Sequence, residues 1–149
     1  MDRSFNGNSD SIGNPSRSAR VAAREADIVA GVPSGGRVFD SDLCLSRLGG
    51  DRELFDEILE IFLEDAPPLL AQAARSMANG DAAALERATH TLKGLSANFA
   101  AAAAITAAYA VELHSRDRRL DSAAICFPQL EAEVHRLEVA LRNFRQQHP

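Results

Sequence analysis

Apolar residues recur at helical spacing along most of this chain, and few segments alternate between apolar and polar residues. Leu54, Ile58 and Phe62 form one such stripe, and Leu130, Val134, Leu137 and Leu141 form another. Hydrophobic residues make up 46% of the chain and much of that share is alanine, the strongest helix former, whereas aromatic residues account for only 5%. The sequence therefore predicts an all-α fold.

Turn signals divide this helical pattern into segments. Gly49-Gly50 is followed by Asp51, and Asn79-Gly80 by Asp81, so in both places a glycine that ends one helix precedes an aspartate that caps the next. A short helix carrying Leu43, Leu45 and Leu48 is expected before the first of these turns. Four long helices with short connections favour an antiparallel bundle. We expect an antiparallel four-helix bundle with a short additional N-terminal helix, over residues 38–147.

Three features of the bundle are harder to read from sequence. Pro67-Pro68 predicts a kink or a restart, with Asp65 as a possible cap, because an internal proline loses a backbone hydrogen bond and clashes with the preceding turn. The run Ala100–Ala104 has no turn residue of its own, so the boundary there is weakly defined. Tyr109 is expected to face inward, together with the alanines of its helix.

Composition limits the possible partners and locations. The net charge of −5 and the pI near 5.3 argue against a nucleic-acid backbone as the main partner. No apolar run is long enough to cross a membrane, and the N-terminus lacks a signal-peptide core, so we expect no membrane contact by this chain and a cytoplasmic location. Cys44 and Cys126 have no disulfide-framework spacing and are expected to be reduced, buried and small.

Residues 1–37 differ in composition from the rest of the chain. They are rich in Ser, Asn, Gly and Arg, with Gly-Val-Pro-Ser-Gly-Gly at 31–36. Such a segment buries too little apolar surface to offset the entropy of ordering it. We expect a disordered tail or an interdomain linker, and composition does not distinguish the two. Its middle part, Ala19 to Ala30, is compatible with transient helix.

His90 is the strongest candidate for a chemical role. At about 100° per residue, the apolar residues of its helix point roughly 140° to 220° away from it. The same period predicts an exposed face around His90 made of small or charged residues, namely Ala83, Glu86, Arg87, Lys93, Gly94 and Ala97. An ordinary solvated histidine is the competing interpretation for any lone exposed His. Neutral imidazole is also a good nucleophile near pH 7.

The segment around His90, Thr89-His90-Thr91-Leu92-Lys93-Gly94-Leu95-Ser96-Ala97-Asn98, resembles the signature of histidine-containing phosphotransfer (HPt) domains. Further similarity lies in Phe39-Asp40, in the turns 47–51 and 79–81, and in the stretch 62–67. The resemblance covers about residues 39–145. It implies a helical module that carries a phosphoryl group on histidine in two-component phosphorelays. The family usually has glycine where this chain has Ala100, so a reshaped turn or an extended helix is expected there.

The resemblance assigns roles to residues on the His90 face. His90 is expected to be the phosphorylated nucleophile, and Lys93, one turn away, to stabilise charge on the phosphoryl oxygens. Gly94 is expected to leave room for a partner. The expected partner-binding residues are Gly94, Ala97, Glu86, Arg87, Ser96 and Asn98. For Ser96 and Asn98, a capping role at the helix end is as well supported as a phosphate role.

The resemblance also implies where the remaining catalytic parts lie. The chain has no Gly-rich phosphate loop and no Asp/Asn cluster for Mg²⁺, so no cofactor or metal is expected on it, and Mg²⁺ is expected on a partner receiver domain. The expected partners are response-regulator receiver domains and a sensor histidine kinase, and the module is compatible with the C-terminal part of a hybrid kinase. The other histidines, His114, His135 and His148, have no partner at metal-ligand spacing.

Two alternative functions remain open from sequence. The bundle is also compatible with a docking module without phosphoryl traffic, although such a module would have little reason to keep His90, Lys93 and Gly94 together. A direct substrate of a chemotaxis-type histidine kinase is the second alternative. Fold resemblance alone does not exclude either. In all of these readings the chain is a carrier or binding module, without kinase activity of its own.

Overall fold

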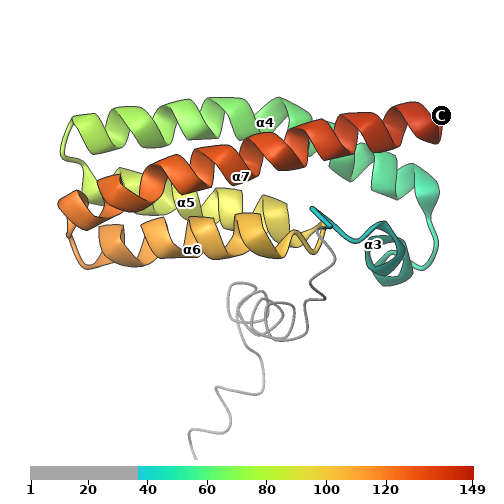
Figure 1. Ribbon diagram of the computed structural model, residues 1–149, viewed down its shortest axis with the longest axis horizontal. Coiled ribbons are helices and arrows are strands. Elements are labelled where there is room, and N and C mark those ends of the chain that lie inside the picture. Colours follow the sequence, from blue (N-terminus) through green and yellow to red (C-terminus); the bar gives the residue numbers. More distant parts are fainter. Residues whose placement is uncertain (1–36) are drawn as a thin grey trace, which may run out of the picture.

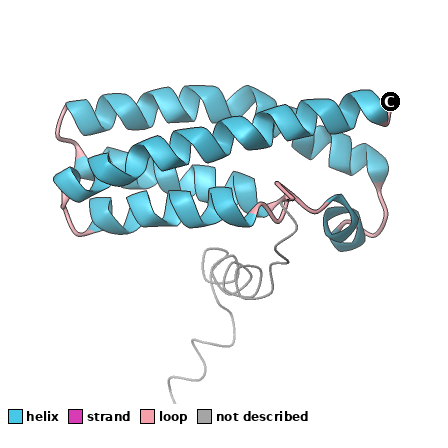
Figure 2. Ribbon diagram, viewed as in Figure 1, coloured by secondary structure: helices cyan, strands magenta, loops and turns pink. Residues whose placement is uncertain are grey.

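The computed structural model describes residues 37–149, which form five α-helices and no strand (Figures 1 and 2). The helices are α3 (Ser41–Arg47), α4 (Arg52–Ala78), α5 (Ala82–Ala97), α6 (Ala102–Arg116) and α7 (Leu120–Gln147). The predicted all-α class is confirmed. The expected tail or linker, residues 1–37, lies outside the described residues except for Arg37.

Helices α4 to α7 lie side by side, and each runs opposite to the one before it, with short turns between them (Figure 1). The short helix α3 lies at the end of the bundle where α4 begins (Figure 1). This is the predicted antiparallel four-helix bundle with an additional short N-terminal helix. None of the helices within residues 37–149 is long and apolar enough to cross a membrane.

Aspartate caps begin the first three of these helices. The side chains of Asp40, Asp51 and Asp81 each accept a hydrogen bond, at 3.0 Å, from the backbone N–H three residues further along. Each bond satisfies a backbone N–H that has no partner inside its helix. Gly49, Gly50 and Gly80 have positive φ angles, which end the preceding helices as the sequence predicted.

Helix α4 continues through Pro67 and Pro68, so the predicted restart at these prolines is wrong. Both proline side chains are exposed. Residues on either side of them, among them Phe62 and Ala73, are fully buried in the same bundle. Two internal prolines each cost about 3 kcal/mol of helix stability, and burial of large side chains on both sides offsets a loss of that order.

Phenylalanine rings fill the end of the core where the α5–α6 turn lies. Phe99 packs edge-on against Phe55 and Phe62, with ring centroids 5.9 and 5.7 Å apart. Phe39 also contacts Phe99 edge-on, at 6.2 Å, before α3 begins. The backbone N–H of Asp40 donates to the carbonyl of Phe99 at 3.1 Å. The first described residues are thereby fixed to the α5–α6 turn.

That turn contains Ala100 with a φ of 51°, in the left-handed region. Helix α5 ends at Ala97 and α6 begins at Ala102, so the helix is not extended through the turn. The N–H groups of Ala100 and Ala101 donate to Ala97 O and Ser96 O, at 3.1 and 3.3 Å. Alanine therefore adopts the conformation usually taken by glycine, at a steric cost that packing of the turn must offset.

Candidate functional site

His90 lies in the middle of α5, and its side chain is 43% exposed. Its Nδ1 atom is 2.7 Å from Oε2 of Glu112, which lies on α6. Glu112 is only 1% exposed. The site thus begins as a pair of side chains, 22 residues apart in the chain, that the packing of α5 on α6 brings into contact.

The carboxylate of Glu112 also forms ion pairs with two cationic side chains. The ammonium of Lys93 is 2.7 Å from Oε1, and a guanidinium nitrogen of Arg116 is 3.0 Å from Oε2. A carboxylate accepts hydrogen bonds. In the neutral imidazole the contact with Glu112 is therefore made by Nδ1–H as donor, which leaves the lone pair on Nε2.

Lys93 lies beneath the surface, where it is 4% exposed, so its predicted place on the exposed face is wrong. Its ammonium lies against Glu112 and over the ring of Tyr109, 4.9 Å from the centroid. Helical period explains the difference. Thr89, Lys93 and Ser96 lie on the flank of His90 that α6 covers, whereas Arg87 and Thr91 lie on the uncovered flank and are exposed.

Tyr109, expected to face inward, is 41% exposed and its inward prediction is wrong. The adjacent positions Ala108 and Val111 are buried as expected. Tyr109 lies on α6, where its ring faces the ammonium of Lys93 on α5. A cation over an aromatic face is stabilised by the negative charge density of the ring.

Arg116 connects the two helices at the open side of the site. Its Nε atom donates to Glu86 on α5 at 3.0 Å, while the same guanidinium contacts Glu112. The hydrogen bond to Glu86 raises the pKa of Arg116, so the group remains charged at any physiological pH. Glu86 is thus engaged within the chain, although it is half-buried and still accessible.

An open hollow of about 600 Å³ lies beside His90. His90, Glu112, Arg87 and Arg116 are among the residues that line it. Two guanidinium groups beside a histidine whose lone pair is on Nε2 make an environment that favours an approaching anion. Phosphoryl groups are anions of this kind.

Gly94 leaves open space one turn beyond His90. A Cβ added at this glycine would meet no atom within 4 Å apart from its own helix. Ala97, in contrast, is 9% exposed, so its predicted exposure is wrong. Arg47 of α3 donates to the carbonyl of Ala97 at 3.3 Å, and α3 covers this end of α5. The accessible surface near His90 therefore ends close to Gly94.

Ser96 and Asn98 have structural contacts at the end of α5. The hydroxyl of Ser96 is fully buried and donates to Leu92 O at 2.8 Å, a bond within the helix, whereas Asn98 is the C-cap residue of α5. Asn98 has an exposed side chain, and its backbone carbonyl accepts the thiol of Cys44 at 3.2 Å. Burial of Ser96 removes its hydroxyl from the surface that a phosphoryl group would reach.

Glu112 and Arg116 belong to the site but were not predicted from the sequence. A signal for Glu112 was present, because helical period places it on the same side as Ile105 and Ala108, which are buried. A carboxylate on the apolar side of an alanine-rich helix requires a charged partner. Arg116, one turn further on, gave no comparable signal.

Two other histidines lie away from the site. The ring of His148, after the end of α7, stacks on Phe144 with centroids 4.3 Å apart. His135 is 75% exposed on α7, and its nearest carboxylate, that of Glu138, is 3.8 Å away. Among residues 37–149, no three His, Cys, Asp or Glu side chains are grouped so that they could hold a metal ion.

Comparisons with known proteins agree with this fold. The family model described as Hpt domain matches residues 57–140, which include His90, Glu112 and Arg116. The structure is similar to histidine-containing phosphotransfer protein B (HptB) from Pseudomonas aeruginosa PAO1, with a TM-score of 0.70 and 23% identity over 77% of this chain and 100% of that one. No curated protein matches the chain.

A second solved structure is the HPT domain of the Hpt sensor hybrid histidine kinase from Shewanella. It has a TM-score of 0.67 and 19% identity, over 74% of this chain and 95% of that one. At these identities the solved structures show a shared fold. The family model matches more than half of the 149 residues. This protein therefore belongs to the Hpt domain family, the histidine phosphotransfer modules of two-component signalling.

Proposed function

We propose that His90 accepts a phosphoryl group from the aspartyl phosphate of a response-regulator receiver domain and later passes it to an aspartate of another receiver. The observation that carries this proposal is the 2.7 Å contact between His90 Nδ1 and the buried Glu112. A carboxylate at Nδ1 favours the Nδ1–H tautomer, and this contact therefore supports Nε2 as the nucleophile.

Transfer from the receiver to His90 requires no proton or other group from solvent. The Nε2 lone pair attacks phosphorus, the P–O bond to the partner's aspartate breaks, and the aspartate leaves as a carboxylate. The imidazole becomes a phosphorylated imidazolium, whose Nδ1–H is already directed at Glu112. The return step reverses these events with a second carboxylate as the nucleophile. Catalysis is then mainly positioning and charge stabilisation.

The chain's own cations have distinct proposed roles. Arg87 and Arg116 line the hollow beside His90 and are proposed to compensate the charge of the phosphoryl oxygens. Lys93 is proposed as a positioning residue, because its ammonium lies 2.7 Å from Glu112 Oε1 and is nearly inaccessible. Its effect on phosphoryl charge then acts through Glu112 rather than by contact.

The surface around His90 is proposed to receive the partner. Gly94 leaves open space one turn from His90, Glu86 and Arg87 line the hollow beside His90, and Asn98 is exposed at the end of α5. Ala97 and Ser96 support this surface from below. Mg²⁺ would be held by acidic residues of the receiver, where it neutralises charge on the phosphoryl oxygens. The donor and acceptor receivers, a cognate sensor kinase, a possible place in a hybrid kinase and a cytoplasmic setting all belong to this proposal.

The test is transfer of a labelled phosphoryl group from phosphorylated receivers to the purified full chain. We expect label that is labile in acid and stable in base, and lost in His90→Gln. His135→Gln is the matched control, because it removes another exposed histidine from a different helix, and it should label normally. Equal labelling of His90→Gln and the unmodified chain would contradict the proposal. Labelling of His90 only by a kinase and ATP, with no receiver active, would favour the chemotaxis-type alternative.

A further inference from the structure

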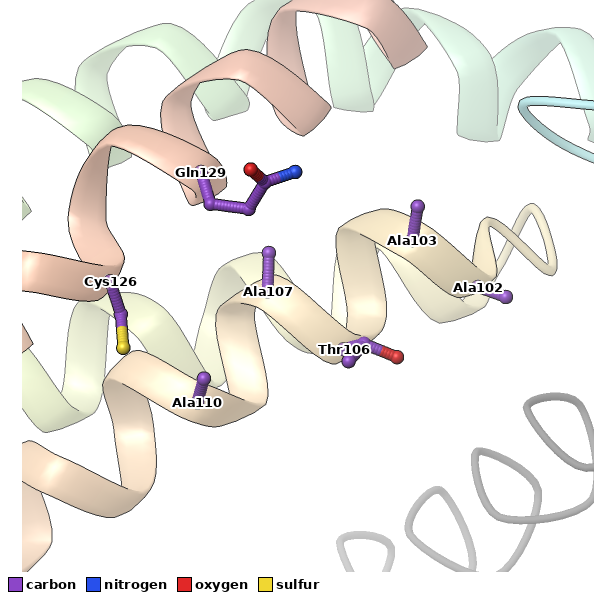
Figure 3. Close-up of a pocket in the computed structure, with 7 residues that line it drawn as sticks. All are labelled: Ala102, Ala103, Thr106, Ala107, Ala110, Cys126 and Gln129. Carbon is purple, nitrogen blue, oxygen red and sulfur yellow. The ribbon is translucent and has the colours of Figure 1, made fainter. Parts of the chain in front are cut away.

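Helix α6 borders two open hollows of similar size, and the two differ in charge. The hollow between α6 and α7, about 500 Å³, is lined by alanines, Thr106, Cys126 and Gln129, and none of these lining residues is charged (Figure 3). The hollow of about 600 Å³ beside His90 is lined by two carboxylates and two guanidinium groups as well as the imidazole. A phosphoryl group on His90 would therefore enter a network of ion pairs that is already formed.

Arg116 joins this network across the two helices. Its Nε atom donates to Oε2 of Glu86 on α5, and its Nη2 atom donates to Oε2 of Glu112 on α6, both at 3.0 Å. The same Oε2 atom of Glu112 lies 2.7 Å from His90 Nδ1. Arg116 Nη2 and His90 Nδ1 are therefore no more than two hydrogen-bond lengths apart.

The two carboxylates that bind Arg116 differ in burial. The side chain of Glu112 is 2% exposed, whereas those of Glu86 and Arg116 are 34% and 49% exposed. An ion pair between side chains that water can reach is weak, whereas a buried carboxylate that loses a charged partner is strongly destabilised. Of the two bonds, the one to Glu86 is therefore the bond that a competing anion replaces at lower cost.

Phosphorylation of His90 supplies such an anion. A phosphoryl group brings about two negative charges near pH 7 and three strong acceptor oxygens. Glu86 lies four residues before His90 on the same helix, a spacing at which like charges destabilise each other. The planar guanidinium of Arg116 matches the geometry of phosphate oxygens. The new group therefore attracts Arg116 and repels Glu86.

We propose that Glu86 is a positioning residue that competes with the phosphoryl group for Arg116. In the unphosphorylated chain, Glu86 holds the guanidinium. On phosphorylation of His90, Arg116 exchanges Glu86 for phosphoryl oxygens and keeps its bond to Glu112, and no covalent bond changes in this exchange. Loss of the Glu86 contact offsets part of what the phosphoryl contact gains, so Glu86 makes phosphorylated His90 a better donor to the next carboxylate. This inference rests on the proposed function, because it concerns control of transfer at the same site.

The test is the equilibrium constant for transfer between a receiver and the full chain, measured from the amounts of phosphorylated His90 and phosphorylated receiver. We expect Glu86→Gln to shift the equilibrium toward phosphorylated His90 about fivefold, an effect of the size that partly exposed ion pairs have. The neutral amide binds Arg116 more weakly and does not repel the phosphoryl group. Asp117→Asn is the matched control and should leave the equilibrium unchanged, because Asp117 follows Arg116 in the chain but pairs with Arg119, at 3.6 Å.

The equilibrium constant separates this role of Glu86 from two others. Glu86 also belongs to the surface proposed to receive the partner, but weaker docking slows the forward and the reverse transfer by the same factor. A contact that only holds α5 against α6 would change the free energy of unfolding of the chain. It would not favour the phosphorylated over the unphosphorylated form. A shifted equilibrium therefore reports competition for Arg116 and not docking or stability.

A second measurement follows Arg116 itself and needs no receiver. Phosphoramidate is a small donor that phosphorylates histidine as its P–N bond breaks and ammonia leaves. We expect the ¹⁵Nε–¹Hε NMR signal of Arg116 to move when the full chain is phosphorylated in this way. The signals of the unmodified chain and of Glu86→Gln should differ before phosphorylation and lie close together after it, because Arg116 then binds phosphoryl oxygens in both chains.

The outcomes distinguish this inference from the proposed function. An unchanged equilibrium in Glu86→Gln, with His90 still labelled by the receiver, would overturn the competition and leave the proposed function intact. An equal shift in Asp117→Asn would also overturn it, in favour of a general effect of charge. If no receiver labels His90, the proposed function fails, and the Arg116 signal after treatment with phosphoramidate still decides the exchange. A signal that does not move on phosphorylation of His90 would contradict it.

Discussion

At the scale of single residues, the central feature is that the nucleophile and the groups that control it lie on different helices. His90 alone is a partly exposed imidazole whose tautomer would be free to change. The buried carboxylate of Glu112 is hydrogen-bonded to Nδ1 of His90, with 2.7 Å between Nδ1 and Oε2. Ion pairs with Lys93 and Arg116 hold this carboxylate in turn. Orientation of a histidine by a carboxylate is a common way to set which ring nitrogen reacts.

Replacement of the carboxylate by an amide tests this arrangement. Glu112→Gln should slow phosphorylation of His90 about tenfold, because the neutral amide binds Nδ1–H more weakly and no longer stabilises the imidazolium. Ring ¹⁵N chemical shifts of His90 should show a smaller fraction of the Nδ1–H tautomer in the variant. Glu131→Gln is the control, since it makes the same change at an exposed position of α7, outside the His90 site. Unchanged rate and shifts in Glu112→Gln would contradict a positioning role.

At the scale of elements, the turn between α5 and α6 determines how these two helices pack, and it contains a residue unsuited to its conformation. Ala100 has a φ of 51°, where a non-glycine side chain costs about 1–2 kcal/mol. The conformation persists because neighbouring residues are well packed. Phe99 and Ala101 are both almost completely buried, and Phe99 contacts three other rings.

Glycine at this position should stabilise the protein. We expect Ala100→Gly to increase the free energy of unfolding by about 1 kcal/mol, because relief of strain exceeds the extra entropy that glycine loses on folding. Urea denaturation of the full chain measures the change. Ala132→Gly, in an exposed position within α7, should instead lower the free energy of unfolding by about 1 kcal/mol. A decrease for Ala100→Gly would show that the turn is not strained.

The short helix α3 is fixed to the end of α5 by Cys44, whose thiol donates to Asn98 O at 3.2 Å. Burial raises the pKa of Cys44 from 9.0 to about 12. Below pH 9 the thiol is protonated in both the folded and the unfolded chain, so the full stability is present. Between about pH 9 and 12 only the unfolded chain loses the proton, and stability therefore falls as pH rises.

Cys44→Ala should remove this pH dependence. The difference in free energy of unfolding between the unmodified chain and Cys44→Ala should shrink by about 1.5 kcal/mol from about pH 9 to about pH 10.5. Urea denaturation at both pH values gives the comparison, and Cys126→Ala, at a half-buried thiol, serves as the control. A difference that stays constant with pH would show that the Cys44 thiol ionises as readily in the folded protein as in the unfolded one.

At the scale of the whole molecule, the site forms only when α5 and α6 pack together, and neither helix contains the whole site. The helix pattern, the aspartate caps and the glycine turns are local signals. The sequence therefore predicted the fold class and the helix boundaries at the two turns, 49–51 and 79–81. The contact between Lys93 and Glu112 could not be predicted from such local signals, because it depends on how α5 and α6 are rotated about their axes. Continuation of α4 through Pro67 and Pro68 also depends on packing of distant residues, which local rules do not include.

The role of His90 Nε2 as the nucleophile is tested most directly by the position of the phosphoryl group on the phosphorylated ring. ³¹P and ¹⁵N NMR of the full chain, phosphorylated by a receiver, distinguishes Nε2-phosphohistidine from Nδ1-phosphohistidine. The contact of Nδ1 with Glu112 predicts that His90 carries the group on Nε2. A phosphoryl group on Nδ1, or on a residue other than His90, would contradict the account.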